Sequence, residues 1–285
     1  MRARAPASSA NLGPGFDTLA VALDRYVSVE IVEAPSLRVH SEGEGSGLFD
    51  DASHLAARVA AEVLGHDRFA VTVRSQIPVA RGLGSSAALA AAAAGAKDPF
   101  AVATAYDGHA ENAAASVFGG LVAATMVEGQ PAHATLPLSE ELAFVAVVPE
   151  RTLATPEARG VLPETLALAD AVFNLGRMGL LVAGLADPGS LVPEAMDDRI
   201  HQPSRTALFP EAPELLRALV EAGALAAGWS GAGPTLIGIV RESTAATVLS
   251  AAEAGLAAAG IPGSALILRA DRRGIVYGDE AAVPL

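Results

Sequence analysis

The stretch from Pro78 to Gly95, PVARGLGSSAALAAAAAG, constrains this chain more than any other. It follows residues 69–77, whose alternating apolar side chains predict a β-strand. The Gly82-Leu-Gly84 segment permits a sharp turn and a close approach of a ligand to the backbone. The alanines after it favour a helix, which either Ser85 or Ser86 is expected to cap.

Such a strand–loop–helix unit suits an anion such as a phosphate, because a helix N-terminus presents unpaired N–H groups and a partial positive charge. It is not a Walker loop, since no Gly-Lys-Ser/Thr follows and Lys97 is the only lysine in the chain. It does not complete a Gly-x-Gly-x-x-Gly dinucleotide fingerprint either. From its spacing alone, an ordinary strand-to-helix turn with a serine cap is the simpler interpretation.

Three segments in order resemble the motifs of the GHMP kinases, a family that includes galactokinases, homoserine kinases and mevalonate kinases. Pro6 to Asp17, PASSANLGPGFD, resembles the first motif, Pro78 to Ala87 the second, and Trp229 to Thr235, WSGAGPT, the third. The resemblance covers nearly the whole chain. It implies a GHMP kinase fold of two domains, an N-terminal domain related to a ribosomal-protein domain and a ferredoxin-like C-terminal domain, with the active site between them.

The expected strands and helices alternate without the regular βαβ rhythm of a doubly wound sheet, which favours the α+β class. A boundary near Pro149 divides the chain into domains 1–148 and 149–285. The patterns predict strands at 2–10, 26–32, 69–77, 119–126, 143–148, 224–230, 235–240 and 265–270, and helices at 54–64, 163–185, 190–200, 211–222 and 243–259, the last capped by Ser243.

Composition narrows the class of partner. A net charge of −13 argues against nucleic acid or an anionic membrane as the main partner. The chain has no cysteine, its first residues lack the apolar segment of a signal peptide, and its longest apolar run, Ala87 to Ala94, is too short to span a bilayer. We therefore expect a cytoplasmic protein with no nucleic-acid or membrane partner. The oligomeric state stays open, with a homodimer as one possibility.

The resemblance implies ATP and Mg²⁺ as cofactors, with ATP on the glycine-rich segment. The ATP-binding residues that it implies are Pro78, Val79, Ala80, Arg81, Gly82, Leu83, Gly84, Ser85, Ser86, Ala87 and Ala88.

Tyr106 to Asn112, YDGHAEN, places two acids and an amide where they suit a cation and a hydroxyl, although spacing alone favours a solvated helix end. The segment resembles the Glu-Gly-His-Pro-Asp-Asn of the homoserine kinases in this family. The resemblance implies Asp107 and Ser86 as metal ligands and Asn112 at the substrate hydroxyl, with Asn112, Asp107 and Ser86 as the catalytic set. The family's glutamate is Asp107 here and its aspartate is Glu111, and Mg²⁺ needs tight octahedral geometry, so the ligand set is open at these positions.

Two further segments resemble those that hold the amino acid in homoserine kinases: Thr155 to Pro163, TPEARGVLP, and Asp198 to Arg205, DRIHQPSR. Arg159 and Arg205 become candidates to bind a carboxylate, which matches the guanidinium fork. Asp17 is a candidate for an ammonium group, although Asn and Asp in such a loop can be turn formers. The substrate-binding residues implied are Asn11, Asp17, His109, Asn112, Thr155, Arg159, Arg205 and Gly231.

These resemblances imply a transferase of amino-acid biosynthesis, which phosphorylates the side-chain hydroxyl of L-homoserine with ATP to give O-phospho-L-homoserine for threonine biosynthesis. No residue stands out as a general base. Two alternatives stay open: another small-molecule GHMP kinase, such as a mevalonate-type kinase, or a non-catalytic protein that binds a nucleotide or an amino acid. A serine hydrolase has little support, because the sequence contains no Gly-x-Ser-x-Gly elbow.

Overall fold

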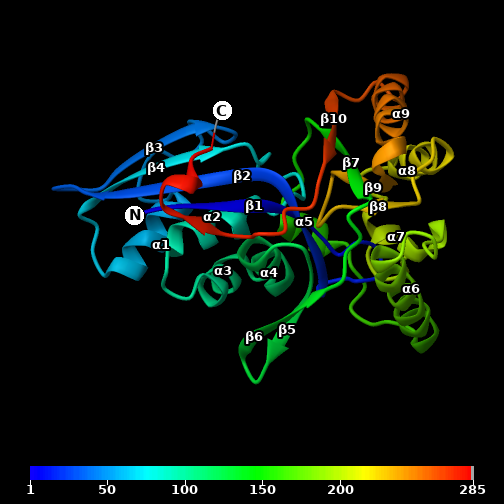
Figure 1. The fold of residues 1–285 in the computed structure, drawn as a ribbon, viewed down its shortest axis with the longest axis horizontal. Coiled ribbons are helices and arrows are strands. Elements are labelled where there is room, and N and C mark those ends of the chain that lie inside the picture. Colours follow the sequence, from blue (N-terminus) through cyan, green and yellow to red (C-terminus); the bar gives the residue numbers. More distant parts are fainter. Residues whose placement is uncertain (284–285) are drawn as a thin grey trace.

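The computed structural model describes residues 1–283 and contains a seven-stranded and a four-stranded β-sheet, each covered by helices (Figure 1). In the first sheet the strand order is β11-β1-β2-β4-β3, and the hairpin β5–β6 joins β2. The strands are β1 (Arg2–Ala10), β2 (Leu19–Glu33), β3 (Arg38–Gly43), β4 (Phe69–Ser75), β5 (Leu121–Val127), β6 (Gln130–Leu136) and β11 (Val276–Tyr277).

Helices pack on the first sheet through unusually small side chains. They are α1 (Leu55–Leu64), α2 (Ser85–Ala94), α3 (Pro99–Asp107) and α4 (Ala110–Phe118). Helix α2 contacts β1 and β2 as well as α1, α3 and α4, and seven of its alanines are buried. Because alanine loses little side-chain entropy in a helix and lets neighbouring backbones approach, this run forms the centre of the first core.

The second sheet is fully antiparallel, with the strand order β10-β7-β9-β8. Its strands are β7 (Leu142–Pro149), β8 (Ala226–Trp229), β9 (Leu236–Arg241) and β10 (Gly263–Leu268). Helices α8 (Ala212–Glu221) and α9 (Ala245–Ala258) pack on it. The order β7-α8-β8-β9-α9-β10 is that of a ferredoxin-like domain, which confirms the predicted α+β class.

The division of the chain between the two sheets does not follow the predicted domain boundary. Strand β7 comes before the predicted boundary at residues 148 and 149, yet it lies in the second sheet. The chain returns to the first sheet at its end, where β11 pairs with β1. The division into residues 1–148 and 149–285 stays a prediction.

Outside the glycine loop, three local predictions differ from the structure. The helix expected at 163–185 begins only at Leu168, as α6 (Leu168–Ala186). The helix expected at 190–200 is absent: this segment holds only a short 3₁₀ turn, η1 (Pro193–Met196), because the Asp198 carboxylate accepts the backbone N–H groups that follow it. Ser243 does not cap α9, since it lies inside the 3₁₀ turn η2 (Glu242–Thr244) and Thr244 occupies the cap.

Helix α6 stands apart from the others in its exposure. Among the helices of the described chain, it alone is long and apolar enough to cross a membrane by length and composition, a test that core helices of other proteins also pass. Only 22% of its apolar window is buried. Figure 1 shows it beside the second sheet, below α7 (Gln202–Arg205).

Candidate active site

The three motifs meet at one cavity of about 580 Å³, lined by residues from both halves of the chain. Nearly all the residues predicted for the site lie on its wall. They are Asn11, Asp17, Pro78, Val79, Ala80, Arg81, Gly82, Leu83, Gly84, Ser85, Ser86, Asp107, His109, Asn112, Thr155, Arg159, Arg205 and Gly231. Ala87 and Ala88 do not line it, because both belong to α2 and their side chains are completely buried in the core.

The glycine loop leaves the N-terminus of α2 open. The cap is Gly84, in the left-handed conformation (φ 65°), and no side chain makes a capping hydrogen bond. The expectation that Ser85 or Ser86 caps the helix was therefore wrong: Ser85 is already the first helical residue. Gly84, Ser85 and Ser86 line the cavity, so this helix N-terminus, which no side chain caps, borders the cavity in the way that suits anion binding.

The loop is held against the third motif by tight contacts. The Ser230 hydroxyl lies 2.6 Å from the Gly82 carbonyl oxygen, to which it donates, and 2.8 Å from Ser9 Oγ. A Cβ on Gly82 would come within 2.2 Å of the Ser230 carbonyl oxygen, so only glycine fits this approach. Nδ2 of Asn11 donates to the Gly231 carbonyl (2.8 Å). The first, second and third motifs are thus one hydrogen-bonded unit.

A chain of polar contacts along the cavity wall links Asp107 to Asp17. His109 Nδ1 lies 2.8 Å from the Asp107 main-chain oxygen and 3.3 Å from its carboxylate, and this contact raises the pKa of His109. The other ring nitrogen accepts a hydrogen bond from Arg159 Nε (3.2 Å). Arg159 pairs with both oxygens of Asp17, at 2.7 and 2.8 Å. Arg159 belongs to α5 (Thr155–Gly160), and sequence spacing gave no sign of this connection.

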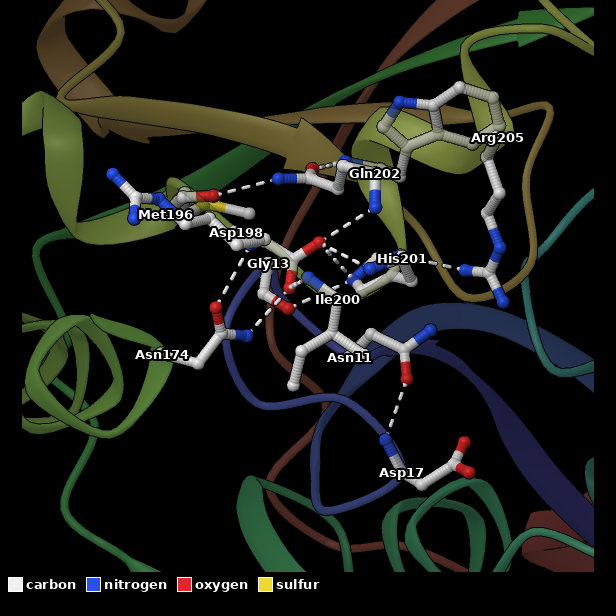
Figure 2. A network of polar contacts seen from close by, with 12 residues as sticks. Asn11, Gly13, Asp17, Asn174, Met196, Asp198, Ile200, His201, Gln202 and Arg205 are labelled. Atoms are coloured by element: carbon white, nitrogen blue, oxygen red, sulfur yellow. Dashed lines mark hydrogen bonds and ion pairs between the residues drawn. The ribbon is translucent and has the colours of Figure 1, made fainter. Parts of the chain in front are cut away.

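Arg205 is a buried cation supported by neutral groups. It is 2% exposed, and its Nη1 donates to the Gly231 carbonyl at 2.8 Å. The same Nη1 donates to His201 Nδ1, also at 2.8 Å (Figure 2). Within residues 1–283, no carboxylate lies within ion-pair distance of it. Burial, and then the charge of Arg159, lower its pKa to about 10, so it stays charged at neutral pH. A buried, unpaired guanidinium on a cavity wall points to an anionic ligand.

Asp198 builds the turn that carries Arg205. Its carboxylate accepts the backbone N–H groups of Ile200, His201 and Gln202 at 2.7–2.9 Å, and Nδ2 of Asn174, from α6, at 2.6 Å (Figure 2). His201 is completely buried, and desolvation lowers its pKa to about 4. It is therefore neutral: its Nε2–H donates to the Gly13 carbonyl while Nδ1 accepts from Arg205.

Asn112 faces the glycine loop from α4. Its Oδ1 accepts a hydrogen bond from the buried Ser8 hydroxyl (2.8 Å), and its Nδ2 lies 3.4 Å from the Glu111 carboxylate. Glu111 is 2% exposed, and desolvation raises its pKa to about 7. The sequence did not predict a role for Ser8, because no pattern in the first motif indicates which serine contacts Asn112, 104 residues away.

Replacing Glu111 with Gln is expected to stabilise the protein at pH 8 and to change little at pH 5. The pKa of Glu111 is about 7 against a reference of 4.5, so the folded state holds its proton more tightly than the unfolded state. The stability that the tighter proton binding gives to the folded state is fully present below pH 4.5 and is lost as the pH rises through 7. The difference between the two pKa values corresponds to roughly 3 kcal/mol of the free energy of unfolding. Thermal unfolding at both pH values tests this, and an equal effect at pH 5 and 8 would contradict it.

Part of the cavity wall is apolar. Leu48, Phe49, Leu55, Val73 and Leu89 line it, from the segment before α1, from α1 itself, from β4 and from α2. No motif indicated that these residues line a cavity, since the sequence predicted only a helix at 54–64 and a strand at 69–77 in this part of the chain. The cavity wall thus combines apolar side chains, an open helix N-terminus and a pair of arginines.

Models of both GHMP kinase domains match this chain. The description "GHMP kinases N terminal domain" matches residues 51–120, and "GHMP kinases C terminal" matches residues 181–264. The homoserine kinase of one Thermus thermophilus strain is 43% identical over 266 residues, which cover 87% of this chain and 90% of that protein. The homoserine kinase of Moorella thermoacetica is 39% identical and covers 84% and 86% of the two chains.

Solved structures agree. A homoserine kinase from Cytophaga hutchinsonii superposes with a TM-score of 0.84 at 28% identity, over 97% of this chain and 96% of that one. The mevalonate kinase of L. major, at 14% identity and a TM-score of 0.68 over 93% and 95% of the two chains, shares the fold. The chain therefore belongs to the GHMP kinase family, and its relatives place it among the homoserine kinases of that family.

Proposed function

We propose that this chain transfers the γ-phosphoryl group of ATP to the side-chain hydroxyl of L-homoserine. The observation that carries the proposal is Arg205, a buried guanidinium without a carboxylate partner in residues 1–283, on the same cavity wall as the open N-terminus of α2. A neutral alcohol would leave this charge unsatisfied, whereas the carboxylate of an amino acid would pair with it. The identity to homoserine kinases supports the same substrate.

ATP fits the cavity along its length. The apolar lining residues Leu48 and Phe49 suit the base, and the glycine loop with the first turn of α2 suits the phosphates. Ala87 and Ala88 would support the loop from the core without touching the nucleotide. Arg81 is engaged by the carbonyl oxygens of Pro149 and Glu150, so we assign it to positioning the loop.

Mg²⁺ would be held by Asp107 and Ser86. Magnesium in phosphoryl-transfer sites is typically bound by one or two carboxylates, with substrate phosphates and water completing the shell. Asp107 and Ser86 both line the cavity, which fits that pattern, although no cluster of three acidic, His or Cys side chains able to hold a metal occurs in residues 1–283. The ion would supply neutralisation of phosphate charge.

Replacing Asp107 with Asn is expected to raise the Mg²⁺ concentration needed for half-maximal rate and to lower turnover, because the amide lacks the charge that attracts the ion. Asp107→Glu, which retains the charge, is the matched control and should keep activity similar to or above the starting protein. Initial rates across a magnesium titration measure both. Unchanged magnesium dependence in Asp107→Asn would remove Asp107 from the metal site.

Homoserine is proposed to lie between the glycine loop and the arginines. Its carboxylate would pair with Arg205 and Arg159, and its ammonium with Asp17. Its hydroxyl would lie against Asn112. The rest of the wall is formed by Asn11, His109, Thr155 and Gly231. The hydroxyl oxygen bonds to the γ-phosphorus as the bond to the bridging oxygen breaks, which releases ADP, and the hydroxyl proton passes to the phosphoryl oxygens or to solvent. Alignment and charge stabilisation account for such catalysis, and no side chain is assigned as a strong base.

A coupled ADP-release assay with homoserine, serine, threonine and mevalonate tests the proposal. We expect homoserine to be turned over with by far the highest kcat/KM. Turnover of mevalonate in preference to homoserine would establish a different small-molecule kinase. Binding of ATP and homoserine without ADP release would establish a non-catalytic binding protein.

We also propose a cytoplasmic homodimer, formed through α6. Leu168, Val172 and Leu175 are 58–81% exposed along one stripe of this helix. Two glycines of the same helix, Gly176 and Gly179, have open space where a Cβ would lie, so nothing in residues 1–283 requires them. Because an interior helical glycine costs about 1 kcal/mol relative to alanine, close packing by the α6 of a second copy would account for both glycines.

Light scattering should show that the starting protein is a dimer and that the Leu175→Glu protein is a monomer. A monomeric starting protein would overturn this proposal.

A further inference from the structure

We infer that Phe16 is a positioning residue for the substrate carboxylate, because its ring contacts both guanidinium groups of the candidate clamp. This inference rests on the proposed function. Cζ of Arg159 lies 5.6 Å from the ring centroid and Cζ of Arg205 lies 5.8 Å from it. Both distances are within the range in which the face of an aromatic ring attracts a cation.

The backbone around Phe16 is fixed, so the ring has a defined place. The Asn11 side chain accepts the N–H of Asp17, and the Thr18 hydroxyl donates to the Phe16 carbonyl. A Cβ on Gly15 would come within 2.6 Å of the Leu19 side chain, which shows how tightly the loop is wound. The imidazole of His201 stacks on Phe16 with centroids 5.2 Å apart and an interplanar angle of 26°.

The two arginines need such support because they repel each other. The charge of Arg159 is the second cause, after burial, of the lowered pKa of Arg205. Asp17 is the carboxylate paired with Arg159, while the contacts of Arg205 within residues 1–283 are neutral: the carbonyls of Gly231 and Ala158, the His201 ring and the Phe16 ring.

A neutral π face suits this place better than an acid would. A carboxylate between the arginines would pair with them and compete with the substrate. The ring of Phe16 attracts both cations without cancelling their charge. Arg205 therefore stays available to an incoming carboxylate, and Arg159 becomes available when the substrate ammonium draws Asp17 away from it. Its neighbour Asp17 supplies the opposite charge for the ammonium from the same loop. One turn of the first motif therefore sets both ends of the amino-acid site.

Replacing Phe16 with Leu is expected to raise the KM for homoserine roughly three- to thirtyfold, as expected for one or two lost cation–π contacts. The KM for ATP and the thermal unfolding midpoint should change little. Phe16→Tyr and Phe16→Trp, which retain an electron-rich face, should keep a homoserine KM close to that of the starting protein. Phe100→Leu is the matched control: Phe100 is 8% exposed, packs on Phe118 and lies outside the cavity lining.

A series of fluorinated phenylalanines at position 16 separates electrostatics from packing. Each added fluorine withdraws charge from the ring face while the size of the side chain changes little, so homoserine KM should rise stepwise with fluorination. This series decides the question even where Phe16→Leu does not fold. Equal homoserine KM across the series, in a protein that phosphorylates homoserine, would overturn the role of Phe16. Failure of the unsubstituted protein to bind or phosphorylate homoserine would instead overturn the proposed function, and with it this inference.

Discussion

Replacing Arg205 with Ala is expected to raise the KM for homoserine by roughly ten- to a hundredfold and to leave the KM for ATP nearly unchanged. A hydrogen bond to a charged group contributes roughly 1.5–3 kcal/mol, and each 1.4 kcal/mol is about tenfold in affinity. Arg205 is 2% exposed and has no carboxylate partner in residues 1–283, so no protein carboxylate would compete with the substrate carboxylate for its guanidinium. Steady-state kinetics with each substrate varied in turn measure the effect.

Two comparisons sharpen this experiment. Arg205→Lys should recover part of the affinity, because the ammonium keeps the charge but lacks the planar fork. Arg217→Ala is the matched control, since Arg217 lies on α8 with a side chain 66% exposed and only long contacts to Glu214 and Glu221. A starting-level homoserine KM in a folded Arg205→Ala protein would remove Arg205 from the clamp and the proposal's main structural support.

Arg159→Ala should have a smaller effect than Arg205→Ala. Arg159 pairs with both oxygens of Asp17, so a substrate carboxylate gains it only when the ammonium draws Asp17 away. Part of the new interaction is therefore offset by the broken pair, which Arg205 lacks. The two substitutions should not be additive, because both groups would grip one carboxylate.

The sequence predicted the parts of the site that rest on local pattern. Gly82 and Gly84 marked a tight loop before an alanine helix, and both have positive φ in the structure. The α+β class followed from the irregular order of strands and helices, and the arrangement β7-α8-β8-β9-α9-β10 confirms it. These features depend on the backbone conformation and burial of a few neighbouring residues, so local composition and residue spacing predict them.

Contacts between distant segments could not be predicted from local sequence patterns. Arg159 and Asp17 are 142 residues apart, and Ser8 and Asn112 are 104 apart, so their pairing depends on how the sheets are packed. The helix expected at 190–200 failed for a related reason: the Asp198 carboxylate satisfies backbone N–H groups and favours a turn. The serine cap failed because the glycine before Ser85 took the cap position.

Replacing Gly84 with Val is expected to lower turnover by roughly a hundredfold or more and to weaken ATP binding. A β-branched residue in the left-handed region costs on the order of 1–3 kcal/mol, so the loop would move. The clash is more specific than this strain: a Cβ at Gly84 would lie 1.9 Å from Ser8 Oγ and 3.1 Å from Asn112 Oδ1. One substitution would displace the phosphate loop and the residue proposed to aim the hydroxyl.

Gly129→Val separates strain from clash. Gly129 has φ 78° and no atom within 4 Å of an added Cβ in residues 1–283, and it lies at the turn between β5 and β6 outside the cavity lining. It should lose stability while keeping the affinity for ATP and the turnover of homoserine. Calorimetric titration of ATP, initial rates and thermal unfolding distinguish the two variants. A folded Gly84→Val protein that binds ATP and turns over homoserine as the starting protein does would show that neither phosphate binding nor the aim of Asn112 depends on this close approach.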